Sequence, residues 1–220
     1  MRVRRVLLTL LTTALGMLLV GPPTSTAQEV RVDAGGGWAV PTNNVESQLG
    51  SGPNTQTLPI DLKPGPHVYA SAGFVRSIGE QFALGARVRG QAARLRSTVE
   101  ACQQEEVACT GAPDGLIQAA TIEGRVILTS PDWIHPYLLV GLGVVHSSVE
   151  GVTAESGGVS FPFPEVSVTD AGGDVGLGAS LPLAAGLQVD AEFRVTGALP
   201  GGKENAVTTL PFSLGLGYQF

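Results

Sequence analysis

The chain has 220 residues, a formal net charge of −6, 30 glycines and 15 prolines. Glycine and proline at this frequency argue against a helical protein and favour many strands joined by turns. The sequence contains no basic patch, so it gives no support for a nucleic-acid partner.

The N-terminal segment has the pattern of a secretory signal peptide. Three arginines precede an apolar stretch from Val6 to Val20, and small residues stand at Ser25 and Ala27. The stretch is short for a membrane anchor. We therefore expect a signal peptide at 1–27 and a single mature domain at 28–220. Its net charge changes from −6 to −9, because the three arginines leave with the signal.

Eight strands are predicted in the mature chain, with no apolar run long enough for a membrane helix. Their ranges are 28–40, 66–77, 81–97, 115–129, 136–148, 166–181, 186–198 and 206–220. The connections alternate between long loops, such as 41–65 and 149–165, and tight turns. This rhythm is typical of transmembrane barrels, and an even strand number places both termini of the chain on the periplasmic side.

Apolar and polar residues alternate along these strands, which separates two faces. An arginine on the lipid face at the membrane midplane costs about 2–4 kcal/mol, so we expect the charged face to point inward. The predicted inward charges are Glu29, Arg31, Asp33, Arg87, Arg89, Glu123, Arg125, Asp170, Asp174, Asp190, Glu192 and Arg194. Mixed charge in the narrow space within eight strands predicts a salt-bridge network that plugs the interior, with an Arg87–Glu123 pair between neighbouring strands.

The last strand carries the most informative pattern. Its apolar side chains recur at every second position and end on two aromatics, Tyr218 and Phe220. This strand resembles the C-terminal strand of bacterial outer-membrane barrels. Together with 136–144 and 176–194, it makes the mature chain similar to small barrels of the OmpA/OmpX type. The resemblance implies an all-β, eight-stranded antiparallel up-and-down transmembrane β-barrel in the outer membrane. Outer-membrane lipid would surround it, and the barrel-assembly machinery would recognise Tyr218 and Phe220.

Aromatic residues near the strand ends are expected to form girdles at the two membrane interfaces. One set would lie at the periplasmic rim and the other at the opposite rim. The first comprises Phe82, Trp133, Tyr137, Tyr218 and Phe220, and the second Trp38 and Tyr69.

Cys102 and Cys109 lie close together in a polar segment, and an exported protein meets an oxidising compartment. We expect them to form a disulfide that stiffens a loop. Closing so short a loop contributes roughly 2–3 kcal/mol at most. His67 and His135 have no partner at metal-ligand spacing, and no cofactor is implied.

The specific role stays open at this stage. A structural or surface-interaction role for a monomer, with an extracellular partner at the long loops, is the main expectation. The apolar 161–164 segment would contact that partner or fold back on the rim. The alternatives are a narrow channel, a soluble lipocalin-like binder with inverted faces, and a lipid hydrolase using His146 and Ser148. The last has a slight likeness to lipid A deacylases, with Glu155 or Glu165 as orienting carboxylate, but the motif does not continue. We expect that the protein is not an enzyme.

Overall fold

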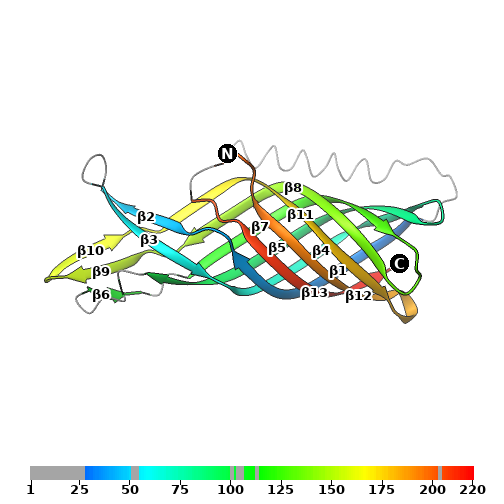
Figure 1. The fold of residues 1–220 in the computed structure, drawn as a ribbon, viewed down its shortest axis with the longest axis horizontal. Coiled ribbons are helices and arrows are strands. Elements are labelled where there is room, and N and C mark those ends of the chain that lie inside the picture. Colours follow the sequence, from blue (N-terminus) through cyan, green and yellow to red (C-terminus); the bar gives the residue numbers. More distant parts are fainter. Residues whose placement is uncertain (1–27, 51–54, 100–101, 103–106, 112–113, 203–204) are drawn as a thin grey trace.

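The computed structural model describes residues 28–50, 55–99, 102, 107–111, 114–202 and 205–220, so the expected signal peptide at 1–27 lies outside it. Eight long antiparallel strands form a closed barrel (Figure 1), as the alternation of faces predicts. They are β1 (Gln28–Pro41), β4 (Gly65–Ile78), β5 (Phe82–Val99), β7 (Gly115–Leu128), β8 (His135–Val149), β11 (Val166–Pro182), β12 (Leu187–Ala198) and β13 (Thr209–Gln219). Every predicted long strand is present within a few residues of its expected range.

The barrel has up-and-down topology. Going round the ring, the order is β1, β4, β5, β7, β8, β11, β12 and β13, which is also the order in the chain. Strand β13 pairs with β1 and closes the ring, with Trp38 opposite Phe212 and Arg31 opposite Gln219. Closure gives every long strand a partner on both sides, which removes exposed sheet edges.

Five shorter strands occupy segments where we expected loops, and that expectation is wrong. They are β2 (Val45–Leu49), β3 (Gln56–Lys63), β6 (Val107–Thr110), β9 (Val152–Ser156) and β10 (Val159–Phe163). The β2–β3 hairpin joins the barrel because β3 pairs with the end of β5. Strands β10, β9 and β6 form a separate three-stranded sheet. Apolar side chains of these short strands are buried against the adjoining end of the barrel. This contact stabilises strands whose proline and glycine residues would otherwise disfavour them.

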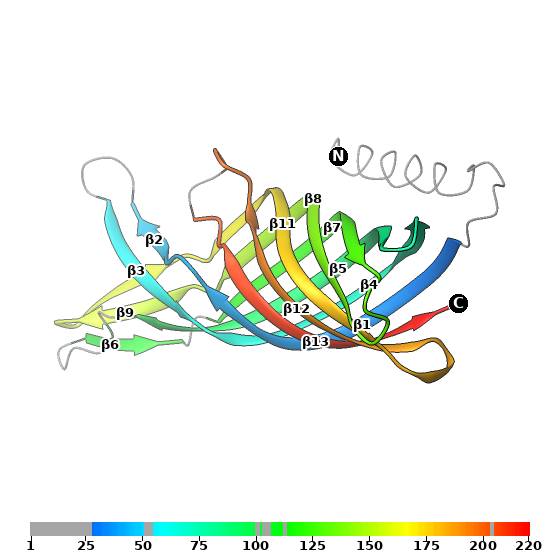
Figure 2. The same ribbon diagram turned by 45° about the vertical axis from the view of Figure 1, so that its right-hand side comes forward.

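The two ends of the barrel differ, as Figures 1 and 2 show. We call the end that carries the β2–β3 hairpin and the β10–β9–β6 sheet the hairpin end. The opposite end, the turn end, has short connections at 79–81, 129–134 and 183–186, the last containing the 3₁₀ turn η3 (Ala184–Gly186). Gln28 and Phe220 both belong to the turn end, because Phe220 donates a backbone hydrogen bond to Val30 in β1.

The outer face of the barrel is apolar and the inner face is polar along most of its height. On β13, Phe212, Leu214 and Leu216 are exposed, whereas Ser213 between them is buried. Successive side chains on a strand point to opposite faces, so a shift of one residue would place the whole apolar set inside. This alternation therefore specifies which face surrounds the lumen.

The interior is filled in three layers, which can be followed along β7 from the hairpin end. Ile117 and Ala119 belong to a large apolar cluster under the hairpins. The buried polar residues Thr121, Glu123 and Arg125 follow. Ile127 then belongs to a small apolar cluster at the turn end, with Ala83, Tyr137 and Leu139. The fully buried charged residues are thus confined to a middle band. The lumen near the hairpin end is lined by buried apolar side chains.

Candidate functional site

Ten charged side chains are buried in the middle band of the barrel, and we call them the lumen cluster. They comprise five arginines and five acids: Arg31, Arg87, Arg89, Arg125, Arg194, Asp33, Glu123, Asp174, Asp190 and Glu192. None is more than 5% exposed. Because the two signs are equal in number, the lumen cluster has no net formal charge.

Two arginines and two glutamates form a closed ring of ion pairs at its centre. Arg87 Nε lies 2.7 Å from Glu123 Oε2, and Arg87 Nη2 lies 2.7 Å from Glu192 Oε1. Arg194 completes the ring, with nitrogens 2.8 Å from both Glu123 and Glu192. Glu123 thus accepts hydrogen bonds from two arginines, and Glu192 from these two and from Arg89. Hydrogen bonds between charged groups are shorter and stronger than those between neutral partners.

The Arg87–Glu123 pair follows from local register, because these residues lie directly opposite each other on β5 and β7. The Arg87–Glu192 pair has a different origin. Strands β5 and β12 are separated by three strands in either direction around the ring. This ion pair therefore spans the lumen, and side chains fill the interior at that level.

The remaining acids are held at the edges of this ring. The Asp190 carboxylate accepts a hydrogen bond from Arg31 Nη2 at 2.5 Å and another from the Ser180 hydroxyl at 2.5 Å. Asp33 accepts hydrogen bonds from Arg87, at 3.1 Å, and from the Ser71 hydroxyl. Charges taken out of water need several partners to compensate for lost hydration, and these hydroxyl groups provide them.

Asp174 depends mainly on neutral donors. The hydroxyls of Thr121 and Thr196 lie 2.7 and 2.5 Å from its carboxylate, while Arg194 Nη1 is 3.7 Å away. Thr196 in turn accepts a hydrogen bond from the Gln91 amide at 3.0 Å. The threonines lie on the same polar face as the predicted charges, so period-two alternation could have identified them.

Two tyrosines belong to this site although we expected them in the membrane girdles. Tyr69 is 5% exposed and Tyr137 3% exposed, both inside the barrel. The Arg89 guanidinium lies over the Tyr69 ring at 3.6 Å, within cation–π range, and the Tyr137 hydroxyl donates to Glu192 at 2.7 Å. The girdle assignment was wrong for these two because it used their position along the strand and ignored which face they occupy.

Glycines on nearby strands of the barrel wall leave space for the rings of Tyr69 and Tyr137. A Cβ at Gly215 would lie 2.0 Å from Tyr69 Oη, and one at Gly178 would lie 2.5 Å from the Tyr137 ring. Neither position could hold a side chain without displacing the tyrosine. Tyr69 and Tyr137 therefore each depend on a glycine nearby in the barrel wall, Gly178 being directly paired with Tyr137.

Two predicted inward charges lie outside the lumen cluster. Glu29 is half-buried near the turn end and accepts a hydrogen bond from Gln219. Asp170 is half-buried near the hairpin end, where it accepts a hydrogen bond from the backbone N–H of Ala171. His67, which the sequence placed alone near a loop, is buried between Gln91 and Ser213. Its inward position follows from the same parity as Tyr69.

The residues of the hydrolase alternative do not assemble into a catalytic group in the described part of the chain. His146 and Ser148 are both half-buried on β8, as the shared parity predicts. The hydrogen bond of His146 Nδ1 goes to the Thr169 hydroxyl at 2.8 Å. Glu155 and Glu165 are exposed, and no hydrogen bond joins either of them to His146.

The hairpin end is reinforced by covalent and apolar contacts. Cys102 and Cys109 form the expected disulfide, with Cα atoms 5.5 Å apart. Phe163 is buried in the apolar cluster and Phe161 packs against it. The apolar 161–164 segment therefore folds back on the rim of the barrel, which was one of its two expected roles.

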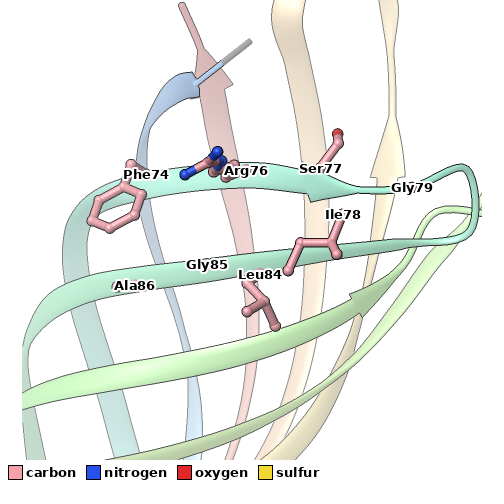
Figure 3. A pocket seen from close by; sticks show the side chains of 8 residues that line it. All are labelled: Phe74, Arg76, Ser77, Ile78, Gly79, Leu84, Gly85 and Ala86. Carbon is pink, nitrogen blue, oxygen red and sulfur yellow. The ribbon is translucent and has the colours of Figure 1, made fainter. Parts of the chain in front are cut away.

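A surface hollow of about 700 Å³ lies on the outer wall at the turn end, away from the lumen cluster. Its lining residues are Phe74, Arg76, Ser77, Ile78, Gly79, Leu84, Gly85 and Ala86 (Figure 3). Most of these side chains are apolar and lie on the outward face of β4 and β5. The hollow thus continues the apolar outer surface and is separate from the charged interior.

The described residues form neither a metal-binding cluster nor a membrane-spanning helix. No set of three or more His, Cys, Asp or Glu side chains is placed there to hold a metal ion. In the same part of the chain, no helix is long and apolar enough to cross a membrane.

Comparison with known proteins identifies the family. The family model for the outer membrane protein beta-barrel domain matches residues 11–220. No curated protein sequence matches the chain. Similar solved structures include OprG of Pseudomonas aeruginosa, with 12% identity and a TM-score of 0.50, covering 89% of this chain and 97% of that chain. Neisserial surface protein A has 18% identity and a TM-score of 0.48, covering 88% of this chain and 97% of that chain.

At these identities the likeness concerns the fold alone, and OprG shares the arrangement of the barrel. The family model has more weight, because it spans almost the whole sequence, including all eight barrel strands. The chain therefore belongs to the outer membrane protein beta-barrel domain family, and the bacterial outer membrane is its location.

Proposed function

We propose that this outer-membrane protein is a closed, non-conducting barrel with a structural or surface-interaction role. The observation that carries this proposal is the Arg87–Glu192 ion pair, which spans the lumen with a nitrogen–oxygen distance of 2.7 Å. The apolar cluster under the hairpins adds a second obstruction, since ions avoid dry apolar surroundings. Both features support a plugged interior in place of a narrow channel.

The hairpin end is proposed to face the outside of the cell. Barrels of this kind have short periplasmic turns and longer extracellular loops, so the turn end would face the periplasm. The β2–β3 hairpin and the β10–β9–β6 sheet would then extend from the cell surface (Figure 2). Connections of this type carry the functional differences among barrels that share one scaffold, so an extracellular partner would bind here.

The other proposed partners follow from the outer surface. Outer-membrane lipid would cover the apolar wall. Tyr218 and Phe220 are exposed on that wall with ring centroids 4.7 Å apart, accessible to the barrel-assembly machinery. We propose a monomer without a nucleic-acid partner, a cofactor or an enzymatic activity.

The soluble lipocalin-like alternative is wrong, because the family resides in the outer membrane. The physical reason is visible in the barrel wall. Its outer side chains are apolar while Arg87, Arg194 and their acidic partners are buried inside. A soluble ligand-binding barrel needs these faces reversed.

Conductance in planar bilayers tests the closed lumen. Refolded protein should insert without producing discrete current steps, whereas regular steps would overturn the plugged reading and favour the channel. Heat-modifiable migration on an unboiled gel, measured on the same sample, would establish that folded barrels were present. A Glu150→Gln variant, changed at an exposed position of the hairpin end, should behave like the wild type.

Complementation of a deletion strain distinguishes the structural role from surface interaction. The full chain would be compared with a variant in which short turns replace 42–64 and 150–165. A structural role requires both chains to restore the barrier of the outer membrane to a hydrophobic dye. If the role is surface interaction, the full chain should restore cell adhesion. The trimmed variant should fold and reach the membrane but should not restore adhesion. Failure of the full chain in both assays would refute the proposal.

A further inference from the structure

The outer wall of the barrel carries very little charge, and Arg76 is the exception near the turn end. Among the described residues, only three Asp, Glu, Lys or Arg side chains occupy outward positions of the eight long strands: Arg76 on β4, and Arg94 and Arg96 on β5. Arg94 and Arg96 lie near the hairpin end, where Arg96 pairs with Lys63 of β3. In the described part of the wall, Arg76 is therefore the one cation near the turn end.

The position of Arg76 along β4 places it near the rim of the barrel. Strand β4 ends at Ile78, two residues after Arg76, and two residues extend about 7 Å along a strand. Across the strand pair Arg76 faces Gln28 of β1, close to where Phe220 donates its backbone N–H to Val30. Long cationic side chains at this level keep their charged end at the membrane interface. The guanidinium can therefore reach the phosphate groups of neighbouring lipids.

The apolar hollow of about 700 Å³ lies beside this arginine. Phe74 and Ile78 line it from β4, on either side of Arg76, and Leu84 and Ala86 line it from β5 (Figure 3). Ala86 pairs with Phe74, so a small side chain lies opposite a large one and the wall is recessed there. Sites for small molecules typically measure about 300–1,000 Å³, so the hollow can hold part of an acyl chain. One cation beside an apolar recess matches an amphiphile with a negative head group.

Charge complementarity favours an anionic lipid over a zwitterionic one. No Asp or Glu occupies an outward position of β4 or of its neighbours β1 and β5, all three of which are described in full. The outward side chains of these strands thus carry only positive charge. A guanidinium donates two parallel hydrogen bonds to the oxygens of a phosphate. Phosphatidylglycerol offers this phosphate alone, whereas phosphatidylcholine adds a cation that a positive wall repels.

We infer that Arg76 and the hollow beside it form a binding site for one anionic phospholipid. The lipid phosphate accepts hydrogen bonds from the Arg76 guanidinium, and one acyl chain lies in the hollow against Phe74, Leu84 and Ala86. The lipid belongs to the leaflet at the turn end. Only the identification of that leaflet as the periplasmic one rests on the proposed function, because the site itself is independent of the lumen and of the hairpin end.

Native mass spectrometry tests this inference. The protein would be purified from bacterial outer membranes into nonionic micelles, delipidated, and titrated with phosphatidylglycerol and phosphatidylcholine of identical acyl chains. The measured quantity is the ratio of the two affinities for the first bound lipid. An arginine attracts an anionic lipid strongly enough for about a five- to tenfold preference for phosphatidylglycerol. Equal affinities in the wild type would overturn the inference.

Three variants test the role of the charge. Arg76→Gln should bring the ratio of affinities close to one. Arg76→Lys keeps the charge without the planar guanidinium, so it should retain part of the preference. Arg94→Gln removes the same charge from an exposed outward position at the hairpin end and should keep the wild-type ratio. An Arg76→Gln variant that keeps the preference, or an Arg94→Gln variant that loses it, would overturn the inference.

A second pair of variants tests the hollow. Ala86→Phe fills the recess while Arg76 is unchanged, and it should weaken the binding of both lipids. Ala120→Phe adds the same bulk to an outward position of β7 outside the hollow and should leave both affinities unchanged. Equal effects of these two substitutions would contradict an acyl chain in the hollow. Heat-modifiable migration of each variant would establish that its barrel is folded, and if Arg76→Gln does not fold, Arg76→Lys and Ala86→Phe decide the outcome.

The same spectra distinguish two other occupants. Displacement of phosphatidylglycerol by inorganic phosphate at equal concentration would identify a site for a free anion and overturn the inference. A wild-type dimer that disappears in Ala86→Phe would identify a second copy of the chain as the occupant and overturn it as well. We expect a monomer that retains one phosphatidylglycerol in the presence of phosphate.

Discussion

Glu192→Gln is the most informative perturbation of the barrel interior. The carboxylate of Glu192 accepts from three arginines, Arg87, Arg89 and Arg194, and from the Tyr137 hydroxyl, at 2.7–2.9 Å. Glutamine keeps the shape of the side chain and removes its charge. The three arginines would then share Glu123 and the more distant acids, so positive charge would accumulate in a dry interior.

The expected loss of stability is large. Removing one member of a buried ion pair costs about 3–5 kcal/mol. With an unfolding slope of about 2 kcal/mol per molar urea, the midpoint should fall by roughly 1.5–2.5 M. The assay is equilibrium unfolding in micelles, followed by the fraction of heat-modifiable protein. The same substitution at exposed Glu150 should change stability by less than about 0.5 kcal/mol.

A second substitution checks the cause. Arg89→Leu in the Glu192→Gln background removes one surplus arginine, so it should recover part of the loss, and the recovery measures the coupling between the two positions. A Glu192→Gln midpoint equal to that of the wild type would refute the reasoning. It would mean that water solvates the arginines and that the lumen is not closed by ion pairs.

Three further predictions concern other parts of the barrel. Leu214→Arg places a charge on the outer wall at the middle of β13, and it should destabilise the barrel in lipid vesicles by about 2–4 kcal/mol, as measured by urea unfolding. Gly215→Ala should cost roughly 1–3 kcal/mol in the same assay because its Cβ overlaps Tyr69, whereas Gly124→Ala, where nothing lies within 4 Å, should be nearly neutral. Phe220→Ala should reduce the amount of folded protein in cellular outer membranes without altering refolding into micelles, and an equal reduction in both would contradict a role as assembly signal.

The positions of the long strands could be predicted because apolar and polar residues alternate in most of them, most clearly over 187–196. The same alternation placed Arg87, Glu123 and Arg194 on the inner face, since a charge facing lipid is costly. The hairpin strands were missed for a different reason. Segments such as 56–63 contain proline and few residues, and they become ordered by burial of Leu58, Ile60 and Leu62 against the barrel rim. That contact joins parts of the chain distant in sequence.

The sequence by itself determined the fold class, the two faces of each strand and the pairing of neighbours such as Arg87 with Glu123. Only the closed ring decided that Arg87 also reaches Glu192, because β5 and β12 become opposite walls once β13 pairs with β1. It also decided that Arg125 has no acid of its own. Alternation predicts which face of the strand a charge occupies. Its ion-pair partner depends on the distance across the lumen, and the lumen forms only when the ring of strands closes.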